Sequence, residues 1–249
     1  MQHVLLRDLG TIDYLSAWNY QESLLQENVR IKTNYNKVLT DTFSNPAEIS
    51  AWDVPTVNYL LLLEHPPVYT LGKSGSAKNI LITEREMNEK GISFFKTNRG
   101  GDITFHGPDQ LVGYPILDLE KFYTDIGRYL RDLEEVIILT IAAYGLKGER
   151  SSGETGVWLD AAITGKARKI CAMGVRCSRW ITMHGFALNV NTDLNYFDYI
   201  IPCGIQNKQV TSIRKELNRA ISMQEVKQKL KRNFEDVFKV ELRLSTDAA

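Results

Sequence analysis

The stretch Arg99-Gly-Gly-Asp-Ile-Thr-Phe-His-Gly-Pro-Asp-Gln-Leu-Val-Gly-Tyr-Pro115 is the part of the chain around which the rest is organised. It holds four glycines and two prolines in seventeen residues. Glycine lets the backbone approach a ligand closely or adopt positive φ, and proline fixes φ. The stretch then becomes the apolar run from Leu111 to Leu117. We therefore expect a shaped loop that leads into a sheet and holds Arg99 and His106 beside rigid backbone. An ordinary hairpin turn is the alternative.

The overall composition indicates one globular domain over residues 1–249. The chain is 43% hydrophobic and 24% charged, and its 30 basic residues balance its 30 acidic ones. This balance does not demand a nucleic acid or a membrane as partner. The start of the chain lacks the apolar core of a signal peptide, and no apolar run reaches the length of about 20 residues that a membrane span requires. Only three cysteines and no C-x-x-C pair occur, which favours a reducing cytoplasm and argues against a structural zinc site.

Hydrophobic spacing outside the opening stretch predicts a mixture of helices and strands. We expect helices over 12–31, 124–144 and 222–237, the last opened by a capping box at Ser222. We expect strands over 57–63, 68–72, 111–117, 157–159, 169–175, 186–190 and 240–244, and irregular segments over 34–54, 73–79 and 148–156. Strands cluster in the middle without regular strand–helix alternation, so we expect an α+β (mixed α/β) fold and not a doubly wound parallel sheet.

Cys203 is a candidate nucleophile. It lies in the turn Pro202-Cys203-Gly204, where proline restricts the backbone before the thiol and glycine leaves room beside it for a backbone N–H to approach an oxyanion. A buried structural cysteine is the alternative. Cys171 and Cys177 lie six residues apart in or beside one predicted strand, and for them packing is the favoured interpretation.

Lys169 is a candidate partner for the thiol because it begins an apolar run. A lysine at the mouth of such a run is partly desolvated, and a nearby ammonium favours a thiolate. Cys203 and Lys169 would then form a nucleophile and proton-transfer pair; a simple strand end is the alternative for Lys169. His184 precedes a glycine at an expected strand start and His65 precedes two prolines, so either is also explained by a structural role.

Several motifs together resemble the lipoyl(octanoyl) transferase family, which belongs to the biotin/lipoate ligase superfamily. They occur in the family's order over about 140 residues: Glu64-His-Pro-Pro-Val-Tyr-Thr-Leu-Gly72, Arg99-Gly-Gly-x-x-Thr-x-His-Gly-Pro-x-Gln110, Tyr114-Pro115, Thr155-Gly-Val-Trp158, Lys169-Ile, Gly174-Val-Arg176, His184-Gly-Phe-Ala-Leu-Asn189 and Pro202-Cys-Gly204.

The resemblance implies a curved mixed β-sheet flanked by helices and an acyltransferase that needs no ATP, metal or other cofactor. Members move an octanoyl group from octanoyl-acyl carrier protein to a lysine of apo lipoyl domains, namely those of 2-oxoacid dehydrogenase E2 subunits and the glycine cleavage H protein. The acyl group passes through a cysteine thioester, which corresponds to Cys203 here, with Lys169 as the proton-transfer group. The implied substrate-binding residues are Arg99, Gly100, Gly101, Asp102, Ile103, Thr104, Phe105, His106, Ala172, Met173, Gly174, Gly185, Phe186 and Ala187, with His65 and His184 as supporting residues. We expect a cytoplasmic monomer.

One position departs from the family pattern. Asp109 stands where the family usually has glycine, and if that position requires positive φ, aspartate adopts it at some cost. Two rival functions remain open, an ATP-dependent lipoate or biotin ligase and a non-catalytic module that binds acyl carriers or lipoyl domains.

Overall fold

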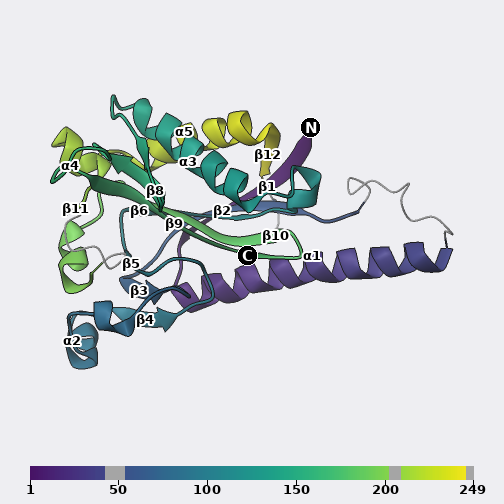
Figure 1. Cartoon of the computed structure of the whole chain (residues 1–249), viewed down its shortest axis with the longest axis horizontal. Coiled ribbons are helices and arrows are strands. Elements are labelled where there is room, and N and C mark those ends of the chain that lie inside the picture. The colour runs from purple at the N-terminus through teal and green to yellow at the C-terminus, as the bar shows by residue number, and fades with distance from the viewer. Residues whose placement is uncertain (43–53, 202–208, 245–249) are drawn as a thin grey trace.

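A large mixed β-sheet forms the centre of the computed structural model, which describes residues 1–42, 54–201 and 209–244 (Figure 1). Nine strands make up this sheet, and eight of them follow the order β12-β1-β2-β6-β10-β9-β8-β7, while β11 pairs with β9. Their bounds are β1 Gln2–Thr11, β2 Asn58–Glu64, β6 Gln110–Ile116, β7 Glu149–Ser151, β8 Glu154–Leu159, β9 Arg168–Ser178, β10 Ile181–Asn189, β11 Gln209–Val210 and β12 Val240–Leu244.

Both parallel and antiparallel pairing occur in the sheet. β1 runs parallel to β2 and to β12, and β11 runs parallel to β9, whereas the other neighbours are antiparallel. The α+β class and the mixed sheet expected from the sequence are therefore confirmed.

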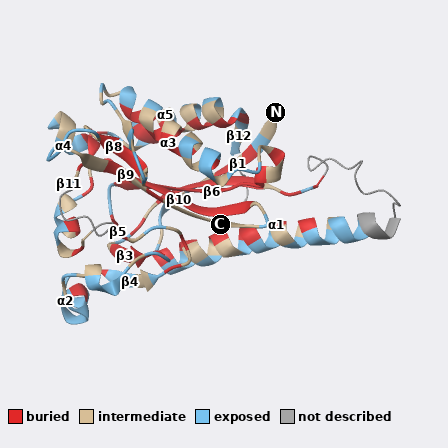
Figure 2. Cartoon of the chain, viewed as in Figure 1, coloured by how far each residue is buried: buried red, intermediate tan, exposed pale blue. Residues whose placement is uncertain are grey.

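Two helices, α3 (Ile126–Ala142) and α5 (Met223–Phe238), cover one face of the sheet, and α1 (Tyr14–Thr42) covers the other (Figure 1). Figure 2 shows the buried residues of the strands enclosed between these helices, with the exposed residues of the helices directed outward. The α5 helix begins where the capping box predicts, because the Ser222 hydroxyl accepts the Glu225 N–H. Helices α3 and α5 each present a stripe of apolar residues to the main core: Tyr129, Leu133, Val136, Ile137, Ile141, Val226, Leu230 and Phe234.

The first helix is longer than the sequence predicts. It continues through residues 32–42, of which 34–42 belong to the segment 34–54 that was expected to be irregular; residues 43–53 lie outside the described residues. Its buried stripe includes the polar residues Gln21, Asn28 and Lys32, which hydrophobic periodicity does not detect. Each of these side chains has at least one polar partner: Gln21 Oε1 accepts the His184 N–H, Asn28 Nδ2 donates to the Val57 carbonyl, and Lys32 donates to Asp118.

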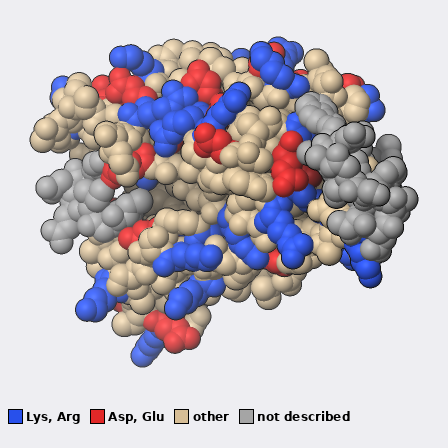
Figure 3. All heavy atoms as spheres, turned by 45° about the vertical axis from the view of Figure 1, so that its right-hand side comes forward, with Lys and Arg blue, Asp and Glu red and all other residues tan. Residues whose placement is uncertain are grey.

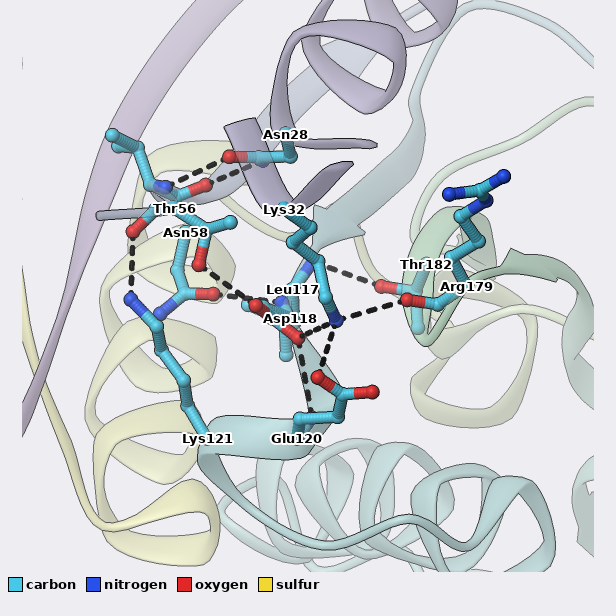
Figure 4. A network of polar contacts seen from close by, with 11 residues as sticks. Asn28, Lys32, Thr56, Asn58, Leu117, Asp118, Glu120, Lys121, Arg179 and Thr182 are labelled. Carbon is cyan, nitrogen blue, oxygen red and sulfur yellow. Dashed lines mark hydrogen bonds and ion pairs between the residues drawn. The ribbon is translucent and has the colours of Figure 1, made fainter. Parts of the chain in front are cut away.

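Lys32 anchors the second half of α1 in a buried polar network (Figure 4). Its ammonium donates to Asp118 Oδ1 at 2.9 Å and to the carbonyl of Arg179 at 3.0 Å, and pairs with Glu120 at 2.8 Å. Asp118 also accepts from the Thr56 hydroxyl at 2.8 Å. The network joins α1 to the end of β6 and to the turn between β9 and β10.

A second sheet of three strands lies below the first, in the order β4-β3-β5. Its strands are β3 Val68–Leu71, β4 Ser93–Lys96 and β5 Ile103–His106, and it packs with the short helix α2 (Glu84–Glu89) and the 3-10 segments η3 (Ala77–Asn79) and η5 (Leu194–Tyr199). The opening stretch therefore runs from β5 of the small sheet to β6 of the large one. The hairpin alternative is wrong, because β5 pairs with β3 while β6 pairs with β2 and β10.

The structure differs from the sequence-based expectations in two other places. Residues 148–156, expected to be a loop, form most of a short hairpin, β7 and the start of β8, because β8 pairs with both β7 and β9. The strand β1 was not predicted. Its residues alternate incompletely between apolar and polar, and its pairing with β2 and β12 comes from segments distant in sequence.

The connection between the two sheets explains Asp109. This residue has φ of 61°, so the position does require the left-handed region, and its N–H donates to the Glu64 carboxylate at 2.8 Å. Aspartate is among the few residues other than glycine that adopt this conformation readily.

The surface carries both signs of charge. Figure 3 shows lysine and arginine interspersed with aspartate and glutamate on the face that it displays, as the zero net charge suggests. Over the described ranges, no helix combines the length and apolar character needed to cross a membrane.

Candidate active site

A cavity of about 630 Å³ lies between the large sheet, the small sheet and the start of α1. This volume is typical of small-molecule sites. Most residues that the sequence singles out line it: Arg99, Gly100, Gly101, Asp102, Ile103, Thr104, His106, Lys169, Ala172, Met173, Gly174, His184, Gly185, Phe186 and Ala187.

The predicted segments on β9 and β10 are brought together by cross-strand pairing. Gly174 lies opposite Gly185, and Ala172 lies opposite Ala187. The antiparallel register therefore makes one cavity wall from two segments that are separate in sequence. Glycine at Gly174 is required by space, since a Cβ there would lie 2.6 Å from the carbonyl oxygen of Gly100.

The Arg99–Asp102 turn forms the facing wall and is held by the arginine itself. The buried guanidinium donates to the carbonyl oxygens of Thr70, Gly100 and Asp102 at 2.5, 2.9 and 2.7 Å, and to the Thr70 hydroxyl. The Gly100 N–H donates to the Val175 carbonyl at 3.0 Å, which fastens the turn to β9. Arg99 therefore shapes this wall; its role in substrate binding, implied by the family resemblance, stays a prediction.

His106 lies in a chain of hydrogen bonds behind this wall. Its Nδ1–H donates to Gln110 Oε1 at 2.8 Å, and its Nε2 accepts from the Thr70 hydroxyl at 3.2 Å. Gln110 Nε2 donates in turn to Asn189 Oδ1 at 2.9 Å. Burial lowers the pKa of His106 well below its usual range, and the positive charge of Arg99 acts in the same direction. The neutral His106 imidazole therefore connects the Arg99–Asp102 turn, through Thr70, to β10, through Gln110 and Asn189.

Two further histidines are buried beside these hydrogen bonds. His65 Nδ1–H donates to the Ile12 carbonyl, and His65 Nε2 accepts from the Tyr114 hydroxyl, both at 2.8 Å. His184 Nε2–H donates to Asn98 Oδ1 at 2.7 Å. Burial lowers the pKa of His65 to about 4 and that of His184 to about 3, so both rings are neutral near pH 7.

The positions of three histidine and aromatic side chains differ from the expected arrangement. His65 does not line the cavity but lies behind three residues that do, since its ring contacts those of Tyr14 and His106 and its Nε2 accepts from the Tyr114 hydroxyl. Phe105 also lies outside the cavity, stacked on Tyr196 with ring centroids 4.5 Å apart. Strand alternation places Phe105 on the opposite face of β5 from Thr104 and His106. His184, expected at a strand start, lies within β10 at a φ of 58°, and its N–H donates to the Gln21 side chain.

Lys169 lies at the other side of the cavity, near the start of β9. It is half-buried and lines the cavity with Thr155 and Val210. The Thr211 N–H donates to the Lys169 carbonyl at 2.9 Å, so β11 is held directly beside this residue. Cys171 is fully buried, as its packing interpretation predicts, and burial raises the pKa of its thiol.

Cys203 lies outside the described residues, as do Pro202 and Gly204. The described residues on either side approach the two cavity walls. Before the gap, the Ile201 N–H donates to the Asn79 carbonyl at 2.8 Å, and Asn79 Nδ2 donates to Asp102 at 2.7 Å. After the gap, Val210 pairs with Lys169.

Sequence reasoning assigned no role to several cavity residues. Tyr14, at the start of α1, carries no local signal. Gln110, Tyr114 and Asn189 lie within the family motifs but received no role, because their contacts join elements far apart in sequence. Among the described residues, no group of three histidine, cysteine, aspartate or glutamate side chains is placed to hold a metal ion.

Structures of lipoate ligases share this fold. A bi-partite lipoate protein ligase from Thermoplasma acidophilum, studied with its E2 lipoyl domain, superimposes with a TM-score of 0.69 at 16% identity, covering 100% of this chain and 88% of the other. Lipoate-protein ligase A bound with ATP gives a TM-score of 0.66 at 16% identity, covering 99% of this chain and 89% of the other. At such identities the similarity establishes the fold alone.

Sequence comparison is more specific. Residues 13–235 match the model of the lipoyl protein ligase A/B catalytic domain. An octanoyltransferase of Christiangramia forsetii is 56% identical over 97% of this chain and 98% of its own length, and one of Flavobacterium johnsoniae is 55% identical over 96% and 98%. The chain therefore belongs to the lipoyl protein ligase A/B catalytic domain family and, within it, to the octanoyltransferases.

Proposed function

We propose that this octanoyltransferase moves an octanoyl group from octanoyl-acyl carrier protein to a lysine of apo lipoyl domains through a thioester on Cys203. The observation that supports it is the convergence on one cavity of Lys169, the Arg99–Asp102 turn and the residues on both sides of the segment that carries Cys203. The expected protein substrates are the lipoyl domains of 2-oxoacid dehydrogenase E2 subunits and the glycine cleavage H protein.

The proposed reaction has two acyl transfers. In the first, the Cys203 thiolate attacks the donor thioester, the new thioester forms, and the carrier thiol leaves with the proton that Lys169 took from Cys203. In the second, the acceptor amine attacks the Cys203 thioester and forms an amide, and its proton passes through Lys169 to the departing thiolate. The first step exchanges one thioester for another, and the second yields the more stable amide, so no ATP or other cofactor is required.

The cavity offers the apolar surface that an eight-carbon chain requires. Ile126, Leu130, Met173 and Phe186 contribute to its lining. Burial of the chain at about 0.8 kcal/mol per CH₂ would contribute several kcal/mol of binding energy and would discriminate against shorter chains. The Gly100 N–H already donates to Val175, so another backbone N–H, such as one near Gly204, would hold the oxyanion.

We propose that the reaction takes place in the cytoplasm and that a single copy of the chain carries it out. Three cysteines and no C-x-x-C pair support a reducing compartment.

The decisive experiment mixes the protein with octanoyl-acyl carrier protein in the absence of ATP and measures the intact mass. Wild type should gain one octanoyl group and lose it when an apo lipoyl domain is added. Cys203→Ser should gain none, while the matched control Cys177→Ser should behave as wild type. A strict requirement for ATP would favour a ligase, and an octanoyl adduct on Cys203→Ser would exclude this cysteine as the acyl carrier. If wild type transferred no octanoyl group under either condition, the non-catalytic binding module would be the remaining explanation of the fold.

A further inference from the structure

The motif Thr155-Gly-Val-Trp158 has no role in the reaction as proposed above, yet it lies against Lys169. Trp158 and Lys169 are direct partners on the antiparallel strands β8 and β9, so their side chains lie on the same face of the sheet. The Lys169 ammonium nitrogen is 4.6 Å from the centroid of the Trp158 ring. An ammonium over an indole face at this distance makes a cation–π contact, and tryptophan is the strongest partner for one.

An irregularity in the strand pairing creates this contact. Val157 pairs with Cys171 and Trp158 pairs with Lys169, so one step along β8 spans two residues of β9. Such a bulge redirects a side chain locally. Here it brings Lys169 opposite the indole, although regular antiparallel pairing would place Ile170 there.

Gly156 lets the backbone of β9 approach β8 closely beside the lysine side chain. A Cβ at this position would lie 3.6 Å from Lys169 Cε and 2.5 Å from the Cys171 carbonyl oxygen. The φ of 120° at Gly156 is also one that residues with a Cβ rarely adopt. The glycine is therefore required by the close approach of β9 and by its own φ, and the Lys169 stem runs alongside it at ordinary contact distance.

A buried carboxylate holds this part of β8 in place. Glu134 of α3 accepts the Gly156 N–H at 2.9 Å and forms ion pairs with Arg131 at 2.7 Å and Arg150 at 3.2 Å. Its side chain is fully buried. The indole, itself 2% exposed, thus presents a fixed surface to Lys169.

We propose that Trp158 is a positioning residue for Lys169: its indole face binds the ammonium and directs the amine into the cavity for proton transfer. The proposal rests on the role of Lys169 in the proposed function. In the first acyl transfer, Lys169 becomes an ammonium when it takes the proton of the thiol, and the indole face stabilises that form. Proton transfer from the thiol is therefore favoured, and the uncharged indole does not oppose thiolate formation as a carboxylate in its place would.

The test measures the contact itself, apart from octanoyl transfer. Wild type, Trp158→Phe and Trp158→Leu are treated with an N-hydroxysuccinimide ester of acetate at about pH 7.5, and acetylation of Lys169 is followed by peptide mass spectrometry. Only the neutral amine reacts, so loss of the cation–π contact should speed Lys169 acetylation about fivefold in Trp158→Leu, with Trp158→Phe between the two. Tyr144→Leu is the matched control. It removes the ring that lies 5.3 Å from the Lys229 ammonium and should leave the Lys169 rate unchanged.

The dependence on pH separates binding of the ammonium from simple shielding. If the indole stabilises the cation, the variant and wild-type rates should converge as the pH rises, because the neutral amine makes no cation–π contact. A rate ratio that stays constant with pH, or equal rates at about pH 7.5, would overturn the proposal. If Trp158→Leu does not fold, Trp158→Phe decides, with an expected rate increase of about twofold.

Octanoyl transfer is then assayed on the same variants. Slower formation of the acyl-enzyme in the order tryptophan, phenylalanine, leucine would support the positioning role. Faster Lys169 acetylation with unchanged transfer would show that the contact exists but that Lys169 does not move the proton, which would count against the positioning role. Absence of octanoyl transfer in wild type would instead reject the proposed function and leave the labelling result standing.

Discussion

Replacement of Lys32 by methionine should destabilise the protein strongly without altering the cavity. The Lys32 side chain is 7% exposed and that of Asp118 is 1% exposed, so the change leaves a buried carboxylate without its cation (Figure 4). Removal of one partner of a buried ion pair costs about 3–5 kcal/mol. The Thr56 hydroxyl and the Glu120 N–H still donate to Asp118, which places the expected loss at the lower end, about 3 kcal/mol.

Thermal and urea denaturation would measure this loss. For a chain of this size about 3 kcal/mol corresponds to a fall in Tm of roughly 6–12 °C. The control is Arg85→Met, which removes an ion pair whose two side chains are 87% and 59% exposed and should change stability by less than about 0.5 kcal/mol. A Lys32→Met variant as stable as Arg85→Met would refute the reasoning, since the buried carboxylate would then be compensated without the lysine.

The remaining predictions concern the cavity walls and their connection. Arg99→Lys should lower stability by about 3 kcal/mol in denaturation and slow acyl-enzyme formation, because a compact ammonium cannot reach all three buried carbonyl oxygens that the planar guanidinium contacts. His65, His106 and His184 have folded pKa values below the unfolded value of 6.5, so the unfolded state binds more protons as the pH falls. Stability should be retained above about pH 6.5 and should drop by about 3 kcal/mol between pH 6.5 and 5.5, measured by denaturation; a flat profile would contradict their neutral burial. Asp109→Gly should raise stability by up to about 1 kcal/mol by relieving the φ of 61°, and a loss of Tm would show that the aspartate side chain contributes more than that strain costs.

Local patterns account for the elements that the sequence predicts well. Ser222 caps the start of α5, the apolar spacing of 124–144 corresponds to α3, and the alternation of 240–244 corresponds to β12. Each of these signals depends on neighbours within a few residues, so no knowledge of the rest of the chain is needed.

The elements that the sequence missed depend on distant partners. The strands β1, β4 and β5 are recognisable only through their pairing with other strands, and the second half of α1 is anchored by Lys32, a polar residue that periodicity counts as exposed. The hairpin of β7 and β8 was obscured by its serines and glycines, which are typical of loops.

For the site, the sequence by itself determined which residue types are present and, through the family motifs, which segments belong to it. Only the tertiary structure decided how they meet. The register of β9 against β10 makes one wall from two motifs, alternation on β5 turns Phe105 away from the cavity, and a bulge places Lys169 on the indole of Trp158. The physical reason is that composition and spacing act along the chain, whereas register, close packing and burial of polar groups are set by contacts between residues far apart in it.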